Sequence, residues 1–490
     1  PRQEGLGKIA DWWIPITPGS DGALALAMLK LIIDSGRYDH EFVEKYTRGF
    51  EEFKAYLDTQ AMEQLSKWCG ISVTDIEKLT DIFCSTTKIP LVAYTGLEYQ
   101  LSAIQNNRAI FVLWAITGKL DAPGAIYLNA KGLETPKLFE IPEEDKPIGV
   151  DEFPLFYKFS GLGQFSRFPK AVLEDEPYPV RGLMILGGSP VLSFPDSKSW
   201  REAYKKLDCL IVLDRYYTED ARYADVVFPA CSLFEVPKAV PGPEGPHIVE
   251  PLIAPVGESK NDVLIMGAIA EKLGFGDKLP QTEEELRSWL LSGTAPYAGD
   301  FGAGAGQKKE KHYKKYETGE LRADGKPGFP TPSGKLEICS TILEENGFVP
   351  YPEYKDIRSI SELAGEEYPF TMTSGARSNN RMGVFGANLD KIAEIEPYPF
   401  VDINAEDAKE IGIEDGDMVK VITPFANGTF KAKIRGIARH AIHIPHGGGS
   451  AYMAEPWKNG NVNDLCSLDY ADPMTGFVLI KSVPCRVEKV

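Results

Sequence analysis

The feature that most constrains the fold of this chain is a change of hydrophobic pattern near residue 368. Before that point, helical segments alternate with short apolar runs such as 182–187 and 209–214. After it, apolar and polar residues alternate one by one, as in 419–423 and 430–435. The first pattern is typical of doubly wound α/β layers and the second of half-buried strands. The sequence therefore predicts two α/β domains followed by a mainly β domain.

The β region carries turn signals that predict a small closed barrel. The pair Asn427-Gly428 separates two alternating runs, which predicts a hairpin turn at these two residues. Ahead of them, residues 404–411 predict a short helix that Gly412 ends. A β domain of this size protects its strand edges by closing on itself. We therefore expect a barrel over residues 368–490.

The N-terminal region is predicted to be mainly helical. Residues 22–34 are apolar on nearly every side, which predicts a buried helix capped by Ser20 and Asp21. Residues 104–117 predict a second apolar helix, and the run 90–95 predicts a short buried strand. Helices alternating with a buried strand indicate an α/β layer here too.

Two stretches without a clear period divide the chain. Residues 125–178 are rich in Pro, Phe and charge, and we expect a long connection that crosses between domains. Residues 291–332 are rich in Gly, Lys and Pro, and we expect a loop there. The predicted domains are 1–135 and 136–367, both α/β, and the barrel that follows.

Composition excludes several classes of function. The net charge of −18 argues against nucleic-acid binding, because such proteins concentrate Lys and Arg on one face. The chain holds no run of about 18 apolar residues, so no membrane span is predicted. Its seven Cys form no C-x-x-C pair, so no zinc or iron–sulfur site is predicted within these residues. An ordinary globular protein remains.

The start of the first apolar helix is a candidate ligand site. Gly19 and Asp21 lie in the segment Pro18-Gly19-Ser20-Asp21, directly ahead of that helix. A helix N-terminus offers free N–H groups and partial positive charge, which suit a phosphate. The Asp21 carboxylate can instead accept two N–H groups from a guanine edge. The alternative is an ordinary helix cap.

Two loops that follow predicted strands form a second candidate site. Gly187, Gly188 and Ser189 follow one buried strand, and Asp214 and Thr218 follow the next. The carboxyl ends of parallel strands meet at one edge, where α/β sheets bind ligands, and glycine lets the backbone approach closely. The alternatives are a structural turn at the glycines and a capped helix start after Asp214.

The predicted barrel contributes further candidates. Ser374 and Gly375 are small, and Arg377 beside them supplies a fork for a phosphate or a carbonyl edge. His446 precedes three glycines, and with only two histidines in view we interpret it as a hydrogen-bonding residue and not as a metal ligand. Asn463 lies in an Asx-rich loop. The alternatives are simple turns and self-bonded Asx turns.

None of these spacings names a reaction, but their order resembles a known family. The chain has no G-x-S-x-G, Walker or G-x-G-x-x-G motif. The segments are similar to the large catalytic subunits of the dimethyl sulfoxide reductase superfamily, which are bis-molybdopterin guanine dinucleotide enzymes. The resemblance is carried by Asp11-Trp12-Trp13-x-Pro15, Pro18-Gly19-Ser20-Asp21-Gly22-Ala23-Leu24, Gly187-Gly188-Ser189-Pro190, Asp214-x-x-x-Thr218-x-x-Ala221-x-x-Ala224-Asp225, Thr331-Pro332-Ser333-Gly334-Lys335-Leu336-Glu337 and Asp415-Gly416-Asp417. The run 331–337 resembles the acetylene hydratase, pyrogallol transhydroxylase and catechol dehydroxylase branch.

The resemblance implies two α/β domains and a C-terminal double-psi-type β-barrel around two molybdopterin guanine dinucleotides that carry Mo or W. Gly19 and Asp21 would serve one guanine end. The other dinucleotide and the barrel contacts would involve Gly187, Gly188, Ser189, Asp214, Thr218, Ser374, Gly375, Arg377, His446 and Asn463. The family often has Asn where Ser189 stands, so this sequence departs from the family at that contact.

The resemblance also implies parts that these residues do not contain. A [4Fe–4S] cluster and the protein ligand of the metal would precede Pro1, and the opening of the chain looks like the middle of a longer protein. The implied reaction is redox, oxygen-atom or hydroxyl chemistry on a small molecule, with an iron–sulfur electron-transfer subunit as an implied partner. Two alternatives stay open: a non-catalytic pterin-fold subunit of an electron-transfer complex, and an inactive fragment with an unpaired sheet edge.

Overall fold

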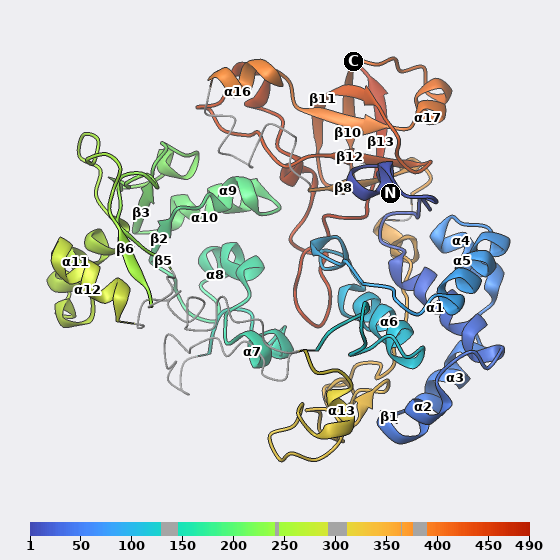
Figure 1. The fold of residues 1–490 in the computed structure, drawn as a ribbon. Coiled ribbons are helices and arrows are strands. Elements are labelled where there is room, and N and C mark those ends of the chain that lie inside the picture. The colour runs from blue at the N-terminus through green and yellow to red at the C-terminus, as the bar shows by residue number, and fades with distance from the viewer. Residues whose placement is uncertain (129–145, 241–244, 293–310, 364, 376–389) are drawn as a thin grey trace.

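The computed structural model describes residues 1–128, 146–240, 245–292, 311–363, 365–375 and 390–490 of the chain. Figure 1 shows a helical lobe at the N-terminus, a lobe around a parallel sheet, and a β-barrel that lies above the space between them. Within the described residues, helices long and apolar enough to cross a membrane are absent.

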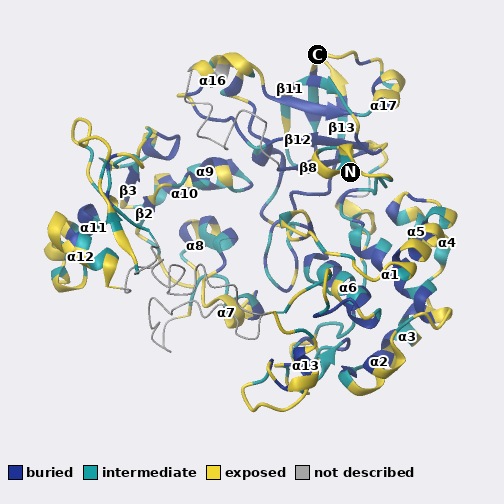
Figure 2. Ribbon diagram, in the orientation of Figure 1, coloured by how far each residue is buried: buried dark blue, intermediate teal, exposed yellow. Residues whose placement is uncertain are grey.

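The helical lobe is built around one buried helix, α1 (Asp21–Asp34). Neighbouring helices surround it: α3 (Phe50–Asp58), α4 (Met62–Cys69), α5 (Val73–Ser85) and α6 (Ala103–Ile116), with α2 (His40–Tyr46) beside them. Leu26, Leu29 and Ile32 of α1 are fully buried, and Figure 2 shows burial along most of its length. A helix that is apolar on nearly every side is stable only when other helices cover it. Both apolar helices predicted from the sequence are confirmed. The predicted cap is wrong, because the Ser20 hydroxyl donates to the Thr17 carbonyl instead and Asp21 is already the first residue of α1.

The strand predicted at 90–95 is wrong. This run is irregular and leads into the short helix η2 (Thr95–Leu97), and the side chains of Val92 and Tyr94 are 82% and 83% exposed. A strand requires a neighbour that pairs with its backbone, and no described strand pairs with this run. An apolar run indicates burial only when such a neighbour is present.

The second lobe contains a three-stranded parallel sheet in the order β2 (Gly182–Leu186), β3 (Cys209–Asp214) and β4 (Val226–Pro229). Helix α10 (Ser197–Lys206) connects β2 to β3, and the short helix α9 (Pro190–Ser193) precedes it. The two predicted strands and the helix between them are confirmed. Because the strands are parallel, their carboxyl ends lie along one edge.

The connection predicted over 125–178 contains two short helices. The prediction of an irregular connection is therefore wrong for part of this stretch. These are α7 (Pro154–Ser160) and α8 (Phe168–Glu174), with the 3-10 turn Phe165–Arg167 between them. Proline stands in the first turn of each helix, where a missing N–H is no loss. Seven-residue helices are too short to show a clear period. Residues 129–145 of this connection lie outside the described part.

The outer side of the second lobe and a returning segment complete the α/β part. The outer elements are β5 (Lys238–Val240), β6 (His247–Val249), α11 (Asp262–Lys272) and α12 (Glu283–Leu291). The returning segment contains α13 (Lys315–Thr318), β7 (Leu336–Glu337) and α14 (Thr341–Glu345).

The returning segment packs on the helical lobe. Strand β7 pairs in parallel with β1 (Thr47–Arg48), and the ammonium of Lys315 lies 2.5 Å from the Asp121 carboxylate in a fully buried ion pair. Part of the loop predicted over 291–332 is therefore ordered around α13, and residues 293–310 lie outside the described part. The predicted domain limits at 135/136 and 367/368 stay predictions.

The C-terminal region is a closed six-stranded barrel, as predicted. Its strands follow the order β10 (Met418–Ile422), β11 (Asn427–Ile434), β9 (Phe400–Ile403), β12 (Ala441–Ile444), β8 (Phe370–Ser374) and β13 (Val483–Lys489). Alternate residues such as Val419, Val421 and Phe430 are fully buried in its core. Helix α17 (Ala405–Glu410) is capped by the Asn404 side chain and stands where the sequence predicts it.

The hairpin between β10 and β11 turns earlier than predicted. Ile422 lies opposite Asn427, so residues 423–426 form the connection and the pair Asn427-Gly428 already belongs to β11. The Thr423 hydroxyl accepts the N–H groups of Phe425 and Ala426, at 3.3 and 3.2 Å. A threonine side chain thus organises the turn that the sequence assigned to Asn-Gly.

The start of the chain lies against the barrel (Figure 1). Arg2 forms a β-bridge with Ile437, and its Nε lies 3.2 Å from Oδ2 of Asp402. This contact brings the segment that leads into α1 close to the ends of β8 and β12. One of the two candidate sites lies at this junction.

Candidate functional site

The first candidate site is a cavity of about 540 Å³ between the start of α1, the segment 91–97 and the barrel. Its walls include Gly19, Asp21, Gln100, Thr373, Ser374, His443 and Lys481. The fold therefore brings three predicted site residues from two distant parts of the sequence to one cavity. We call this cavity and its polar residues the first cluster.

Gly19 and Asp21 place the start of α1 at the cavity. Gly19 has φ +90°, and a Cβ there would lie 2.7 Å from Cβ of Ser482, so only glycine fits this approach to the barrel. Burial raises the pKa of Asp21, and its carboxylate accepts a long hydrogen bond of 3.3 Å from the Gln100 amide. A buried carboxylate so weakly bonded has capacity to accept further N–H donors.

Lys481 is a buried cation at the same cavity. It is 9% exposed, its ammonium donates to the Ser374 carbonyl, and burial lowers its pKa to about 8. Among the described residues, no carboxylate forms an ion pair with it. A buried ammonium without a carboxylate partner favours an anionic ligand, because an unpaired buried charge is costly.

Gly375 and His446 lie next to Lys481. Gly375 has φ +104°, and a Cβ there would lie 2.1 Å from the Lys481 ammonium and 3.6 Å from Nε2 of His446. Burial, assisted by the charge of Lys481, lowers the pKa of His446 to about 4. His446 is therefore neutral at pH 7 and can hydrogen-bond without adding charge.

His443 supports the loop that carries Gly375. Its Nε2 lies 2.9 Å from the Gly375 carbonyl, and its Nδ1 lies 3.2 Å from Oδ2 of Asp402. Burial lowers the pKa of His443. Within the ranges that the structure describes, no three His, Cys, Asp or Glu side chains gather as a metal site requires.

The second cluster lies at the carboxyl edge of the parallel sheet. Gly187 has φ +61°, and a Cβ there would meet no atom within 4 Å, so the backbone at this turn is open. Burial raises the pKa of Asp214, whose carboxylate accepts the N–H of Tyr216 at 2.9 Å. The Thr218 hydroxyl accepts the N–H of Ala221 at 3.2 Å, in the short helix η4 (Asp220–Arg222). Thr218 thus bonds to the first turn of η4, whose N-cap residue is Glu219, as in the alternative of a capped helix start that the sequence left open.

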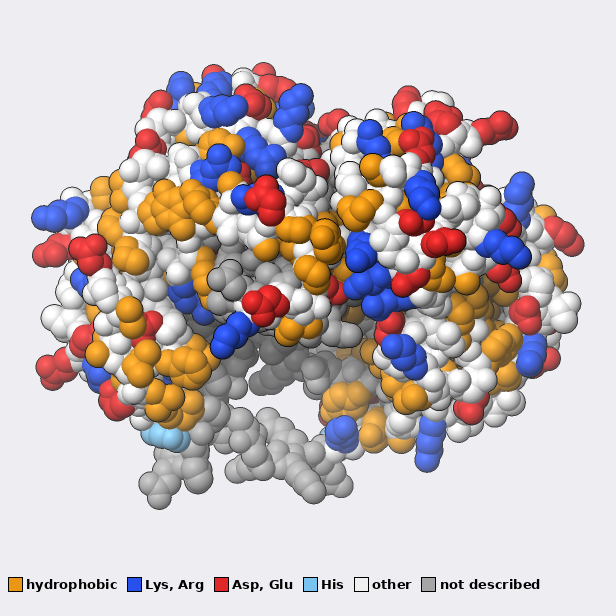
Figure 3. Space-filling view, turned by 90° about the horizontal axis from the view of Figure 1, so that it is seen from above, with side chains coloured by type: hydrophobic (Ala, Val, Ile, Leu, Met, Phe, Trp, Pro, Cys, Tyr) orange, Lys and Arg blue, Asp and Glu red, His pale blue; other side chains and the backbone are white. Residues whose placement is uncertain are grey.

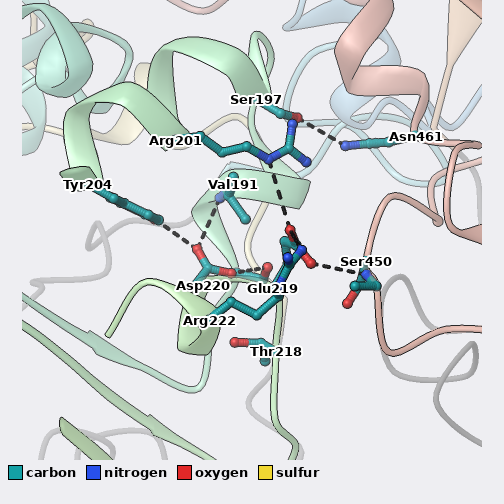
Figure 4. Close-up of polar contacts among 12 residues, drawn as sticks. Val191, Ser197, Arg201, Tyr204, Thr218, Glu219, Asp220, Arg222, Ser450 and Asn461 are labelled. Carbon is teal, nitrogen blue, oxygen red and sulfur yellow. Dashed lines mark hydrogen bonds and ion pairs between the residues drawn. The ribbon is translucent and has the colours of Figure 1, made fainter. Parts of the chain in front are cut away.

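Ser189 is tied to a buried carboxylate. Its hydroxyl donates to Oδ2 of Asp220. The other oxygen of Asp220 accepts the N–H of Val191 at 3.1 Å and the hydroxyl of Tyr204 at 2.7 Å (Figure 4). Burial raises the pKa of Asp220. These bonds hold the loop after β2 against the loop after β3.

The barrel reaches the second cluster through Asn463. Its amide nitrogen donates to the Leu192 carbonyl at 2.7 Å, while its buried Oδ1 has no hydrogen-bond partner among the described residues. A buried acceptor without a partner costs about 1–3 kcal/mol unless a ligand or a water supplies a donor. The sequence grouped Asn463 with the other barrel candidates, whereas the structure places it at the sheet edge.

The predicted site residues thus divide between two places. Gly19, Asp21, Ser374, Gly375 and His446 surround the first cluster, and Gly187, Gly188, Ser189, Asp214, Thr218 and Asn463 surround the second. Arg377 lies outside the described residues. The barrel contributes to both clusters.

Several further residues of these clusters were missed from the sequence. Lys481 stands alone in the apolar run 477–483, a signal that could have found it. Glu219 and Asp220 are charged residues five and six positions after the end of β3, a weaker signal, and Gln100 gave none. Their roles depend on which segments meet in the fold.

One face of the molecule shows how its charged side chains are distributed. Seen from above the view of Figure 1, the molecule is hollowed between its two sides, and Lys and Arg side chains are interspersed with Asp and Glu (Figure 3). Nucleic-acid binding relies on a continuous basic face. The face in this view is not of that kind.

Comparison with known proteins defines the class. Residues 1–272 match the molybdopterin oxidoreductase family, and residues 371–484 match the molydopterin dinucleotide binding domain. The fold is similar to that of acetylene hydratase from Pelobacter acetylenicus, with a TM-score of 0.81 and 22% identity over 100% of this chain and 73% of that one. The chain therefore belongs to the molybdopterin oxidoreductase family, and the predicted family and fold class are confirmed.

Two relatives show the range of this family. The chain is 29% identical to the probable oxidoreductase YoaE of Bacillus subtilis, over 85% of this chain and 59% of that protein. It is 28% identical to the F420-dependent formate dehydrogenase subunit alpha of Methanocaldococcus jannaschii, over 91% of this chain and 66% of that protein. The chain spans just under two thirds of these curated relatives.

Proposed function

We propose that this chain forms the cofactor-binding body of a molybdenum- or tungsten-dependent oxidoreductase. It binds two molybdopterin guanine dinucleotides and catalyses redox, oxygen-atom or hydroxyl chemistry on a small molecule. The observation that carries the proposal is that one barrel contributes to two separate clusters, with Ser374 and Gly375 at the first and Asn463 at the second. Two dinucleotides need two such places.

The first cluster has the donors and acceptors that one dinucleotide requires. The Asp21 carboxylate accepts N–H groups of a guanine edge, and the Lys481 ammonium neutralises an anionic group. The neutral imidazole of His446 hydrogen-bonds beside it. The positive φ of Gly375 leaves room for the ammonium, since a Cβ would occupy its place.

The second cluster suits the other dinucleotide in a different way. The open turn at Gly187 and Gly188 lets backbone N–H groups approach a phosphate. The unpartnered Oδ1 of Asn463 is an acceptor that a bound N–H or O–H group would satisfy. The Asp214 carboxyl lies on the same edge of the sheet.

The division of labour follows from these residues. When bound, the metal–pterin group supplies the electron and atom transfer. The chain binds and orients the dinucleotides and sets the charge around them through Asp21 and Lys481. The chain is similar to a formate dehydrogenase named as a subunit alpha, which supports a partner subunit, and the family resemblance implies that this partner is an iron–sulfur electron-transfer subunit.

The test is elemental analysis for Mo, W and Fe, with extraction of pterin nucleotide, on the full-length gene product. We expect about one Mo or W and about two guanine dinucleotides per chain. Iron in the same sample would support the [4Fe–4S] cluster that the family resemblance implies. Absence of Mo, W and pterin would sink the proposal, and iron alone would favour a non-catalytic electron-transfer subunit.

A further inference from the structure

A buried carboxylate fastens the barrel to the sheet lobe beside the second cluster. Glu219 is 3% exposed, and its Oε2 accepts the N–H of Ala451, which lies in the segment that connects β12 to β13, at 3.0 Å. Its Oε1 lies 2.7 Å from Nη1 of Arg222 and 4.0 Å from Nε of Arg201 (Figure 4). We call Glu219, Arg201, Arg222 and Ala451 the latch.

The latch has little freedom to rearrange. A buried carboxylate is stable only when its charge is compensated and its oxygens are bonded. One oxygen faces a guanidinium and the other faces a backbone N–H, so both sides of the Glu219 carboxylate are used. The position of the Ala451 backbone is thereby tied to the loop that follows β3.

Other contacts cross the same boundary. The rings of Tyr217 and Tyr452 meet edge to face, with centroids 5.0 Å apart. The Asn461 amide donates to the Ser197 hydroxyl at 3.2 Å, and the Asp196 N–H donates to the Asn463 carbonyl at 3.2 Å. Residues 450–463, which connect β12 to β13 and place Met453 and Trp457 in the core of the sheet lobe, are therefore held to that lobe at both ends.

The residue before this segment packs closely against the end of the segment. Gly449 has φ +95°, and a Cβ there would lie 2.8 Å from Cβ of Asn461 and 3.0 Å from Cδ2 of Leu192. The N–H of Gly449 donates to the Trp457 carbonyl at 2.8 Å. In a segment packed this closely, a shift at Ala451 reaches Asn461 and Asn463, because well-packed contacts transmit displacement.

We propose that Glu219 is a positioning residue for the cofactor. Glu219 holds residues 450–463 against the carboxyl edge of the sheet. Asn463 and the Asp214–Thr218 loop can then contact the same ligand. This inference rests on the proposed function, in which a dinucleotide occupies the second cluster. Glu219 itself is bonded to protein groups on both oxygens and acts through Asn463.

The substitution Glu219→Gln tests this with little change of shape. A glutamine must direct its NH2 group either at the Arg222 guanidinium or at the Ala451 N–H, and both are donors. One latch contact is therefore lost while the cores of the barrel and of the sheet lobe are unchanged. We expect the dinucleotide to dissociate about 10- to 100-fold faster, the range for a lost hydrogen bond to a charged group.

The experiment uses the full-length gene product purified with its cofactor. The rate at which guanine dinucleotide leaves the protein is measured by chromatography for wild type, E219Q and the control E202Q. Glu202 is an exposed residue of α10 that is bonded to Lys205 at 2.8 Å, and its variant should release cofactor at the wild-type rate. The Tm of cofactor-free and cofactor-loaded protein is measured alongside.

The Tm values distinguish positioning from a structural role. A positioning role narrows the difference in Tm between loaded and cofactor-free protein, because the stabilisation by a bound ligand grows with the logarithm of its affinity. A structural role lowers both Tm values together and leaves that difference intact. If E219Q fails to fold, R222Q must still speed release severalfold, because it removes the guanidinium that fixes Oε1 of Glu219 and so loosens the side chain that holds the Ala451 N–H.

The outcomes separate the two proposals. Wild-type release rates in E219Q, or in R222Q where E219Q does not fold, overturn the latch and leave the proposed function standing. A wild-type protein that holds no dinucleotide overturns both. Faster release with a narrowed Tm difference supports the latch.

Discussion

The two clusters differ in how their polar side chains are used. At the first, Lys481 is a buried charge for which the described residues offer no carboxylate partner, and the Asp21 carboxylate accepts only a long side-chain hydrogen bond from Gln100 among them. At the second, Ser189, Asp220 and Thr218 are bonded to groups of their own lobe, and the open atoms are backbone groups and one amide oxygen. One chain thus prepares two ligand sites by different means, with free side-chain charge at one and an ordered backbone at the other.

This difference predicts where mutations act. Substitutions at the first cluster should change ligand affinity and pH dependence, because its charges are held ready for a ligand. Substitutions of the bonded side chains at the second cluster should change the stability of the protein itself. The predictions below test this contrast.

The largest effect is expected at the second cluster, from Asp220→Ala. This change leaves the Tyr204 hydroxyl, the Ser189 hydroxyl and the Val191 N–H without their acceptor. We expect the free energy of unfolding of the cofactor-free protein to fall by about 3–5 kcal/mol, as for other broken buried networks. Denaturant unfolding measures it, with the exposed Asp208→Ala as control. A loss below about 1 kcal/mol would contradict the structural role given to this carboxylate.

Residues of the second cluster also show how far the sequence could predict the structure. The strand Cys209–Asp214 and the helix Ser197–Lys206 appear where their local patterns predict them. The role of Asp220 was not predictable, because its partners lie 16 to 31 residues away and meet it only in the folded lobe. The local hydrophobic periodicity predicts helices and strands, whereas the hydrogen-bond partners of a side chain depend on how these elements pack.

The same limit explains the errors. The run 90–95 is as apolar as a strand. A strand also needs a pairing partner from another part of the chain, and the local sequence does not show whether one is present. The turn at 423–426 depends on the Thr423 side chain, where the sequence favoured the familiar Asn427-Gly428 pair. At the first cluster, Gly19 and Asp21 were found because their helix start is local, while Gln100 gave no signal at all.

The next effect is a pH dependence of stability from His446. Burial lowers its pKa to about 4 from an ordinary 6.5. Between those values the unfolded chain binds a proton that the folded protein does not, so stability is lost as pH falls through this window. The loss is on the order of 3 kcal/mol between pH 7 and pH 4.

The variant His446→Gln isolates this contribution. Its free energy of unfolding should fall by about 3 kcal/mol less than that of wild type over the same window. His440→Gln, an exposed residue of the same barrel, is the control and should follow wild type. Parallel curves for wild type and H446Q would show that His446 is not held in its neutral form.

A somewhat smaller effect is expected on ligand affinity from Lys481→Gln. Loss of the buried ammonium should weaken dinucleotide binding about 10- to 100-fold at pH 7. Because the pKa of Lys481 is lowered to about 8, wild-type affinity should also fall as pH rises above 8, by at most about tenfold per pH unit. The K481Q variant should lose that slope, and Lys489→Gln, an exposed ion-paired lysine, should keep it.

The charge of Lys481 should affect the stability of the cofactor-free protein and its affinity for the ligand with opposite signs. Its pKa in the folded protein lies below its ordinary 10.5, so between pH 8 and 10.5 the unfolded chain binds more protons, and stability from this group rises with pH. The cofactor-free K481Q protein should therefore be no less stable than wild type at pH 7. A marked loss of stability would make Lys481 a structural residue like Asp220 and would remove the contrast between the clusters.

The smallest effect on stability is expected from Gly187→Ala, and it probes the backbone directly. An added Cβ meets no atom within 4 Å, so the cost is only that of placing alanine at φ +61°, about 1 kcal/mol. Gly375→Ala is the counterpart at the first cluster, where the Cβ would lie 2.1 Å from the Lys481 ammonium and must displace it. If the backbone at Gly187 contacts a ligand, G187A weakens dinucleotide binding severalfold although the free protein tolerates it, and the loss does not depend on pH.

G375A should instead weaken dinucleotide binding and also reduce the pH dependence of affinity that Lys481 provides. Unfolding curves and dinucleotide affinities at pH 7 and pH 9 measure the effects of both variants. A G187A protein with wild-type affinity would place the ligand away from this turn. The Asn463 oxygen would then be the remaining ligand contact proposed at the second cluster.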